Sequence, residues 1–155
     1  MKTRTVLLTL ALCLVGISVA VADDANMGTW KLNEAKSMFP AGATKNSTVV
    51  YEAAGDDIKV TVDGTDKDGN AVHNEWTGKF DGKDYPLTGD PAMNTRSYKR
   101  INARSLALTG KKDGKVISAG RIVVSADGKT RTVKLTATDS TGKKLESTAV
   151  YNKQQ

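Results

Sequence analysis

Cysteine and histidine are almost absent from this sequence of 155 residues, which contains one of each, Cys13 and His73. A structural zinc site needs about four Cys or His ligands, and a cysteine or serine nucleophile needs a histidine base beside it. His73 and Glu75 are two residues apart and are too few to form a metal site. Paired carboxylates occur only in stretches that we expect to be turns. We therefore expect no metal, no other cofactor and no enzymatic activity.

Long blocks of like charge are also missing, although the net charge of the chain is +6. Basic and acidic residues are scattered singly over the expected strands and turns, a pattern typical of a soluble surface. Binding of nucleic acid would favour clustered Lys and Arg residues among stacking aromatic side chains. Aromatic residues make up only 5% of the chain, and Tyr98-Lys99-Arg100 is the one such cluster. We expect no nucleic-acid partner.

The one long hydrophobic run lies at the N-terminus. A positively charged start, an apolar stretch over 6–19 and an Ala-x-Ala sequence at its end are typical of a secretory signal peptide over 1–22. The run is too short for a membrane-spanning helix of about 20 residues. It also contains Cys13, so the exported chain has no disulfide. We expect cleavage before Asp23, one domain over 23–155, and a secreted or periplasmic location.

Apolar and polar residues alternate over most of the remaining chain. Near the C-terminus, Val133, Leu135 and Ala137 alternate with polar residues. A period of two puts alternate side chains on one face of a β-strand. Asp127-Gly128 and Thr141-Gly142 supply the positive φ angles that tight hairpin turns need. The pattern therefore predicts antiparallel strands that are joined by hairpins.

The alternation predicts an all-β fold, a single antiparallel up-and-down barrel of about ten strands whose last strand pairs with the first. No connection is long enough for a parallel crossover, and at most one short helix is expected, near residues 34–39. Lys59, Asp63 and Lys134 on strand faces exclude a barrel with lipid-facing walls. The expected strands cover residues 28–32, 47–53, 58–63, 72–80, 96–101, 106–109, 116–124, 132–138 and 145–151, with a short strand around Tyr85.

Three segments resemble the calycins, the superfamily of the lipocalins and the intracellular fatty-acid-binding proteins. Gly28-Thr29-Trp30 is similar to the glycine–tryptophan motif of the first barrel strand in that family. The run 111–115 followed by Arg121 resembles a fatty-acid-binding hairpin whose next strand carries an inward arginine. Residues 149–153 resemble the last strand of the family. The beginning of the domain, Gly-Thr-Trp-Lys-Leu-Asn, also resembles a group of secreted bacterial lipocalin-like proteins.

The resemblance implies a barrel that holds a small apolar or amphipathic molecule, and it implies roles for particular residues. Trp30 would plug one end of the barrel. Arg121 would anchor a ligand carboxylate beside Tyr151, which occupies the position of the family's inward tyrosine. Ala149 stands where the family has a second inward arginine, and the family's helical lid is reduced to 33–46 at most. We therefore expect weaker binding of simple fatty acids than in the family.

Small residues on expected inner faces favour an open cavity. A barrel of about eight strands is just filled by its side chains or holds one small ligand, and more strands enclose more space. Small lining residues leave part of that space for a guest molecule. The alternative is a flattened barrel whose walls collapse onto each other. The small residues in question are Gly78, Gly110, Ala119, Ala137, Ser147 and Ala149.

Five residues are the expected ligand contacts: Arg121, Tyr151, Trp76, Tyr51 and Tyr98. Trp76 and Tyr51 stand on apolar strand faces, where they either stack on a ligand or fill the core. Arg121 shares its face with Ile117, whereas Ile122 lies opposite, so both faces are partly apolar and the period leaves the direction of Arg121 open. An inward Arg121 would need an anionic partner, because burying a lone charge costs several kcal/mol.

Taken together, these patterns predict a monomer that binds a small hydrophobic or amphipathic, lipid-like ligand inside its barrel. The alternative is an envelope or inhibitor-type module that binds another protein through the exterior and loops of the barrel. The segment 33–46, which contains Met38-Phe39-Pro40, is the candidate loop for that alternative.

Overall fold

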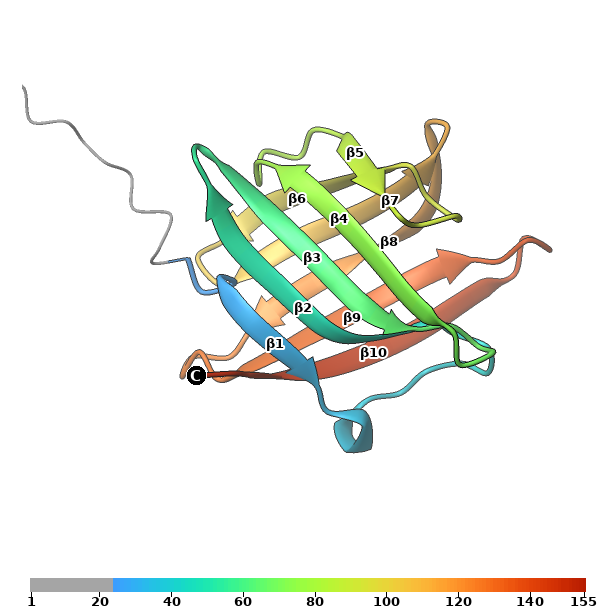
Figure 1. The fold of residues 1–155 in the computed structure, drawn as a ribbon, viewed down its shortest axis with the longest axis horizontal. Coiled ribbons are helices and arrows are strands. Elements are labelled where there is room, and N and C mark those ends of the chain that lie inside the picture. The colour runs from blue at the N-terminus through green and yellow to red at the C-terminus, as the bar shows by residue number, and fades with distance from the viewer. Residues whose placement is uncertain (1–23) are drawn as a thin grey trace, which may run out of the picture.

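Ten antiparallel strands close into one barrel in the computed structural model, which describes residues 24–155 (Figure 1). The expected signal peptide over 1–22 and its cleavage point lie outside the described residues. The barrel confirms the predicted fold class. Its strands are β1 (Gly28–Leu32), β2 (Lys45–Ala54), β3 (Asp57–Thr65), β4 (Ala71–Gly78), β5 (Tyr85–Thr88), β6 (Thr95–Asn102), β7 (Ser105–Lys112), β8 (Lys115–Val124), β9 (Thr130–Thr138) and β10 (Lys144–Lys153).

The first and last strands close the barrel. β1 lies between β2 and β10, and Trp30 is opposite Val49 on one side and Lys153 on the other. Closure leaves none of the ten described strands at an open edge, and an exposed edge strand is where other chains can add. The expected pairing of the last strand with the first is therefore confirmed.

The hairpin between β7 and β8 shows how the sequence forms these turns. Asp113 has a φ angle of 49° and Gly114 one of 81°. Two successive positive φ values match the right-handed twist of the strands on either side, and Asp-Gly tolerates them better than almost any other pair. The hairpin that the resemblance implied for the run 111–115 is therefore present, with a two-residue turn at Asp113-Gly114.

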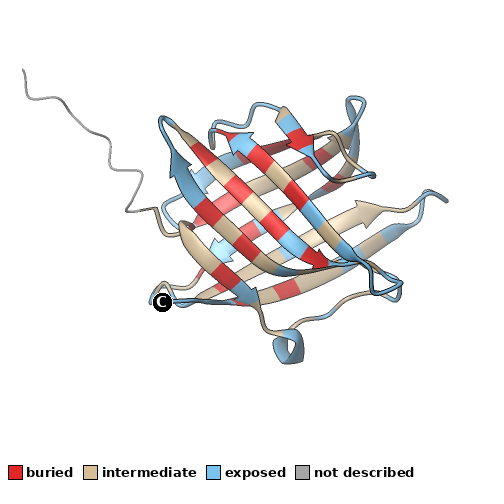
Figure 2. Ribbon diagram, in the orientation of Figure 1, coloured by how far each residue is buried: buried red, intermediate tan, exposed pale blue. Residues whose placement is uncertain are grey.

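Burial follows the period of two expected for a barrel with a buried inner face and a solvated outside (Figure 2). Along β3, the buried residues alternate with more exposed ones. The core is apolar and aromatic, and its larger buried members are Trp30, Trp76, Tyr51, Leu106, Ile122 and Val60.

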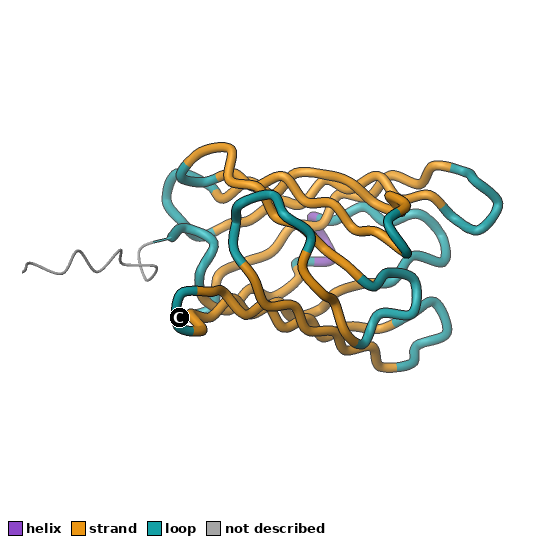
Figure 3. Tube along the Cα trace, turned by 90° about the horizontal axis from the view of Figure 1, so that it is seen from above, coloured by secondary structure: helices purple, strands orange, loops and turns teal. Residues whose placement is uncertain are grey.

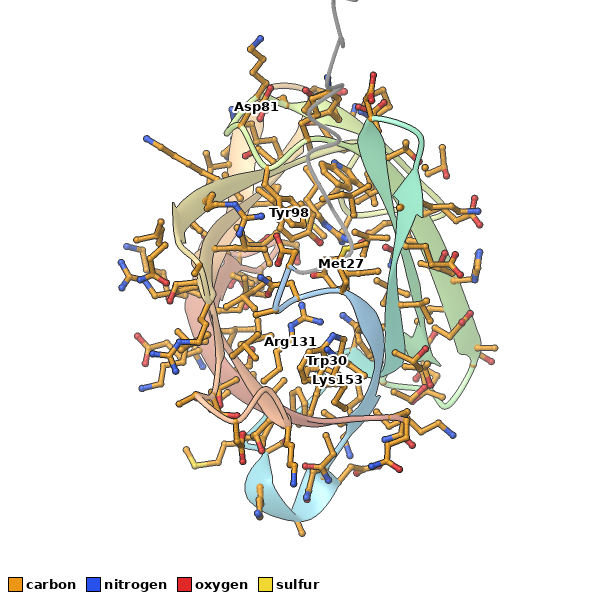
Figure 4. The ribbon with its side chains drawn as sticks, turned by 90° about the vertical axis from the view of Figure 1, so that its left-hand side faces the viewer. Met27, Trp30, Asp81, Tyr98, Arg131 and Lys153 are labelled. Atoms are coloured by element: carbon orange, nitrogen blue, oxygen red, sulfur yellow. The ribbon has the colours of Figure 1, made fainter. Side chains whose placement is uncertain are left out.

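One end of the barrel is closed by aromatic side chains. Trp30 is completely buried, and its Nε1 donates a hydrogen bond of 2.8 Å to the carbonyl oxygen of Asn26 (Figure 4). Within the core, the rings of Trp76 and Tyr98 meet edge to face, with their centres 4.7 Å apart. Such pairs stabilise a core beyond the area that they bury. Trp30 plugs this end, as expected.

The segment between β1 and β2 continues along β10 beyond the end of β1. It contains one 3-10 turn, η2 (Glu34–Lys36), capped by Asn33, which agrees with the expectation of at most one short helix (Figure 3). Met38 then pairs with Thr148 of β10 through two backbone hydrogen bonds of 2.7 and 2.8 Å. The segment is therefore bound to the wall.

Candidate ligand-binding cavity

The interior of the barrel contains a cavity of about 460 Å³. This volume lies within the range of roughly 300–1,000 Å³ that is usual for small-molecule sites. The walls therefore do not collapse onto each other, and the flattened alternative is wrong. The apolar part of the lining comes from several strands and includes Val49, Val62, Leu108, Val133, Leu135 and Leu145.

Two connections at the end opposite the plug contribute to the lining. Residues 40–46, which lead into β2, and 89–93, between β5 and β6, both border the cavity. Met93 reaches inward over Gly110, where an added Cβ would overlap its sulfur atom. Ser118 Oγ donates a hydrogen bond of 3.4 Å to the same sulfur. The small residue Gly110 thus accommodates a side chain from a loop and does not enlarge the cavity.

Arg131 on β9 lies at the plugged end of the cavity and is only 3% exposed. Figure 4, which looks at that end, shows Arg131 inside the ring of strands beside Trp30. Its Nη2 donates a hydrogen bond of 2.6 Å to the hydroxyl of Tyr51. The guanidinium carbon also lies 4.6 Å from the ring centre of Tyr51 and 5.5 Å from that of Tyr151. Arginine over aromatic faces is a favourable cation–π arrangement.

The charge of Arg131 has no counter-ion among residues 24–155. Its Nε and Nη1 are buried and have no hydrogen-bond partner. Burial raises the pKa of Tyr51 well above its usual value, and burial likewise raises the pKa of Tyr151. Both phenols therefore stay neutral near neutral pH and do not balance the positive charge. Two guanidinium nitrogens, with three N–H donors between them, and one net charge remain to be satisfied at the floor of the cavity.

A second buried arginine, Arg96 on β6, borders the same cavity and is 7% exposed. Its Nη1 donates a hydrogen bond of 3.3 Å to Oδ1 of Asn74, which is also buried. Its backbone oxygen accepts a bond of 2.8 Å from Nε1 of Trp76, which fixes this part of β6. Asn74 is neutral, so Arg96 likewise lacks a counter-ion within the described chain.

Three of the five expected contact residues line the cavity: Tyr51, Tyr98 and Tyr151. Trp76 does not belong to the lining. Its ring stacks on Phe80 at 6.4 Å and meets Tyr85 and Tyr98 edge to face. Trp76 therefore fills the core, the second of the two roles that the sequence left open for it.

The expectation that Arg121 points into the barrel is wrong, because its side chain is exposed on the outer surface of β8. The cause is an irregularity in the pairing of β7 with β8, where Lys111 faces Val116 but Gly110 faces Ser118. Ile117 is the extra residue of this bulge, and a bulge changes which residues face inward. Ala119, expected on the inner face, is also exposed for this reason.

Sequence reasoning missed Arg96 and Arg131, although the signal was present for both. Arg131 has the same parity as Val133, Leu135 and Ala137, all of which line the cavity. Arg96 is two residues before Tyr98 on the same strand. A charged residue at an inward position within an apolar series is unusual, because lone buried charges are costly.

From residue 24 onward, no group of three or more His, Cys, Asp or Glu side chains is placed to hold a metal ion. The same part of the chain contains no helix with the length and hydropathy that a membrane crossing requires.

Comparison with solved structures gives matches at low sequence identity. EF1p2_mFAP2b bound to DFHBI matches with a TM-score of 0.51 and 10% sequence identity over 84% of this chain and 94% of that chain. The redesigned barrel mFAP1 bound to DFHBI gives 0.45 and 17% over 84% and 99% of the two chains. A fluorescence-activating β-barrel designed de novo gives 0.43 and 15% over 86% and 97%. No protein-family model and no curated protein matches the sequence.

Proposed function

We propose that this protein binds a small amphipathic anion, such as a fatty-acid-like molecule, inside its barrel. The observation that carries the proposal is Arg131, a buried guanidinium with two unpartnered nitrogen atoms at the end of a cavity. An unpaired buried charge destabilises a fold by several kcal/mol. A carboxylate or similar group at this position would accept charge-assisted hydrogen bonds from this guanidinium and balance its charge.

The remainder of the cavity suits the apolar part of such a ligand. Val62, Leu108, Val133 and Leu135 line it from different walls. Removing apolar surface from water contributes about 25 cal/mol per Å² before entropic costs are subtracted. A molecule with an anionic head at Arg131 and an apolar tail against these side chains would satisfy both parts of the lining.

The fold itself is compatible with this role. EF1p2_mFAP2b, a barrel of similar fold, is bound to the small molecule DFHBI. We also propose that residues 1–22 direct export and that the barrel acts outside the cytoplasm, in the periplasm or secreted, by carrying or sequestering its ligand. No catalytic step is part of this proposal.

Binding of a protein through the exterior is the alternative, and its candidate loop supports it less well. Phe39 is partly buried and packs against the core, and Lys45 lies over its ring at 5.9 Å. Met38 is 74% exposed, but its backbone is paired with Thr148. Met38 is therefore the one large apolar side chain that this segment exposes, and its backbone is fixed.

Displacement of a fluorescent fatty acid tests the proposal. We expect saturable binding by the wild type and roughly tenfold to a hundredfold weaker binding by Arg131→Gln, since hydrogen bonds to charged groups are worth about 1.5–3 kcal/mol. Arg121→Gln is the matched control, because it removes an arginine from the outer surface and should leave the affinity unchanged.

Arg131→Lys is a second variant that keeps the charge and loses the planar fork of donors, and it should give an intermediate affinity. Melting curves of each variant show whether it is folded. No saturable binding by the wild type would overturn the proposal, and so would equal affinities of folded Arg131→Gln and the wild type.

A further inference from the structure

The two buried arginines act on one region of the cavity. Arg131 is bonded to the hydroxyl of Tyr51, and the Tyr51 ring lies 6.2 Å from the ring of Tyr98. Arg96 is two residues before Tyr98 on β6, and both arginines border the same cavity. Both arginines act on Tyr51: the positive charge of each lowers the pKa of Tyr51, against the rise that burial causes. The polar part of the cavity therefore carries two positive charges.

The carboxylates that border the cavity do not neutralise these charges. Asp66 and Asp90 are the acidic residues in the lining, and both belong to loops. Asp66 accepts hydrogen bonds of 2.9 Å from the backbone nitrogens of Asp68 and Asn70, and Asp90 accepts one of 2.8 Å from Ala92. Among the described residues, neither forms an ion pair with Arg96 or Arg131.

We propose that the cavity selects an amphiphile whose head group carries two negative charges, such as a phosphate monoester or a dicarboxylate. This inference rests on the proposed function and specifies its ligand class. One dianionic head group would balance Arg131 and Arg96 together. Two singly charged amphiphiles would instead have to place two tails in about 460 Å³, a volume within the usual range for a single ligand.

The donors available to such a head group come from different elements. Arg131 offers Nε and Nη1 from β9, and Arg96 offers the guanidinium nitrogens that do not bond Asn74. Planar guanidinium groups match the paired oxygens of phosphate and carboxylate groups. A head group with a single charge would leave one buried arginine without compensation, which is why the second charge should increase affinity.

Octyl phosphate and octyl sulfate form a matched pair of probes, because they have the same chain and a tetrahedral head but differ in charge. The second ionisation of a phosphate monoester has a pKa of about 6. By isothermal titration below the critical micelle concentration, we expect octyl phosphate to bind roughly tenfold or more tightly than octyl sulfate at about pH 8. At about pH 5, where both probes carry one charge, the two affinities should converge.

The ionisable groups that line the cavity are Tyr51, Tyr98, Tyr151, Arg96 and Arg131, with Asp66 and Asp90 in the loops. Octyl sulfate keeps one charge between about pH 5 and pH 8, so the difference between the two probes over this range reports the charge of the phosphate. Arg96→Gln should remove the preference for phosphate at about pH 8 while sulfate affinity changes little, and Arg121→Gln should behave as the wild type.

The wild-type comparison alone decides the inference, even if a variant fails to fold. Equal affinities of the wild type for both probes at the higher pH would overturn the preference for two charges and leave the proposed function intact. Binding of neither probe, together with no binding of a fluorescent fatty acid, would overturn both.

Discussion

Burial determines what individual residues do at the plugged end of the barrel. Tyr51 and Tyr151 have raised pKa values because burial disfavours their charged forms, so their hydroxyls remain protonated beside Arg131. They can position the guanidinium but do not cancel its charge. A single acidic residue in place of either tyrosine would change whether the cavity needs an anion.

At Gly78 the backbone lies directly against an aromatic ring, which leaves no space for a side chain. A Cβ at position 78 would lie 2.5 Å from Cγ of Tyr85. The ring cannot easily move, because it meets Trp76 edge to face at 5.7 Å and its hydroxyl donates a bond of 2.9 Å to Asp81. We expect Gly78→Ala to lower the free energy of unfolding by about 1–3 kcal/mol in denaturant titrations.

Thr77→Ala is the matched control for Gly78→Ala, because Thr77 is the exposed neighbour on the same strand. Its effect should stay within about 0.5 kcal/mol. If Gly78→Ala were as stable as this control, the tight contact with Tyr85 would not describe the protein in solution.

At the scale of elements, the pairing of β3 with β4 places a row of charges on the outer surface. His73 faces Asp63 across the strands, and the distance from Nδ1 to Oδ1 is 2.7 Å. His73 also lies 3.7 Å from Glu75, which forms a closer ion pair of 2.8 Å with Lys59. The hydrogen bond with Asp63 is the largest cause of a raised pKa of His73.

This raised pKa predicts a direction for stability against pH. A histidine whose pKa is higher in the folded state stabilises the fold below its ordinary pKa of about 6.5 and loses that contribution as the pH rises through the folded value. We therefore expect the melting temperature to fall slightly as the pH is raised from about 6 through the pKa of His73. The contribution is small because the pair is exposed and screened by solvent.

His73→Gln should flatten this part of the pH dependence, and NMR titration of the histidine ring should give a pKa above that of a free histidine. An unshifted pKa would show that the contact with Asp63 is not maintained in solution.

The sequence predicted the strands well because alternation and Gly-containing turns are local signals. The direction of Arg121 was not predictable from the period, because the bulge at Ile117 has no clear signal in residue type and reverses the inward face of the rest of β8. The role of Trp76 depends on Phe80, Tyr85 and Tyr98, which are separated from it along the chain. Arg131, by contrast, could have been identified by extending the inward series of Val133 and Leu135 by one position.

At the scale of the whole molecule, closure through β1 and β10 holds the two ends of the barrel domain together at its plugged end. Leu32 of β1 pairs with Tyr151, and Tyr151 pairs with Arg131 of β9. Closure therefore also positions two residues of the cavity floor. Loss of the last strand would remove a wall of the cavity as well as the support of the plug.

Removal of residues 148–155 should abolish cooperative folding, because it leaves β1 and β9 with unpaired edges and opens the core. Circular dichroism during thermal unfolding measures this directly. A chain that ends at Gln154 is the control and should melt as the full chain does, since Gln155 is exposed. Cooperative melting of the shorter chain at the same temperature would show that closure is not needed for folding.

The proposed function requires that Arg131 binds an anionic ligand inside the barrel. The most direct measurement is the ¹H–¹⁵N signal of its Nε–H group, assigned by its absence in Arg131→Gln, during titration with decanoate. Because this nitrogen is buried and has no partner, we expect a saturable downfield shift at one ligand per protein while the signal of Arg121 stays unchanged. An unmoved Arg131 signal, or shifts confined to arginines on the outer surface, would contradict it.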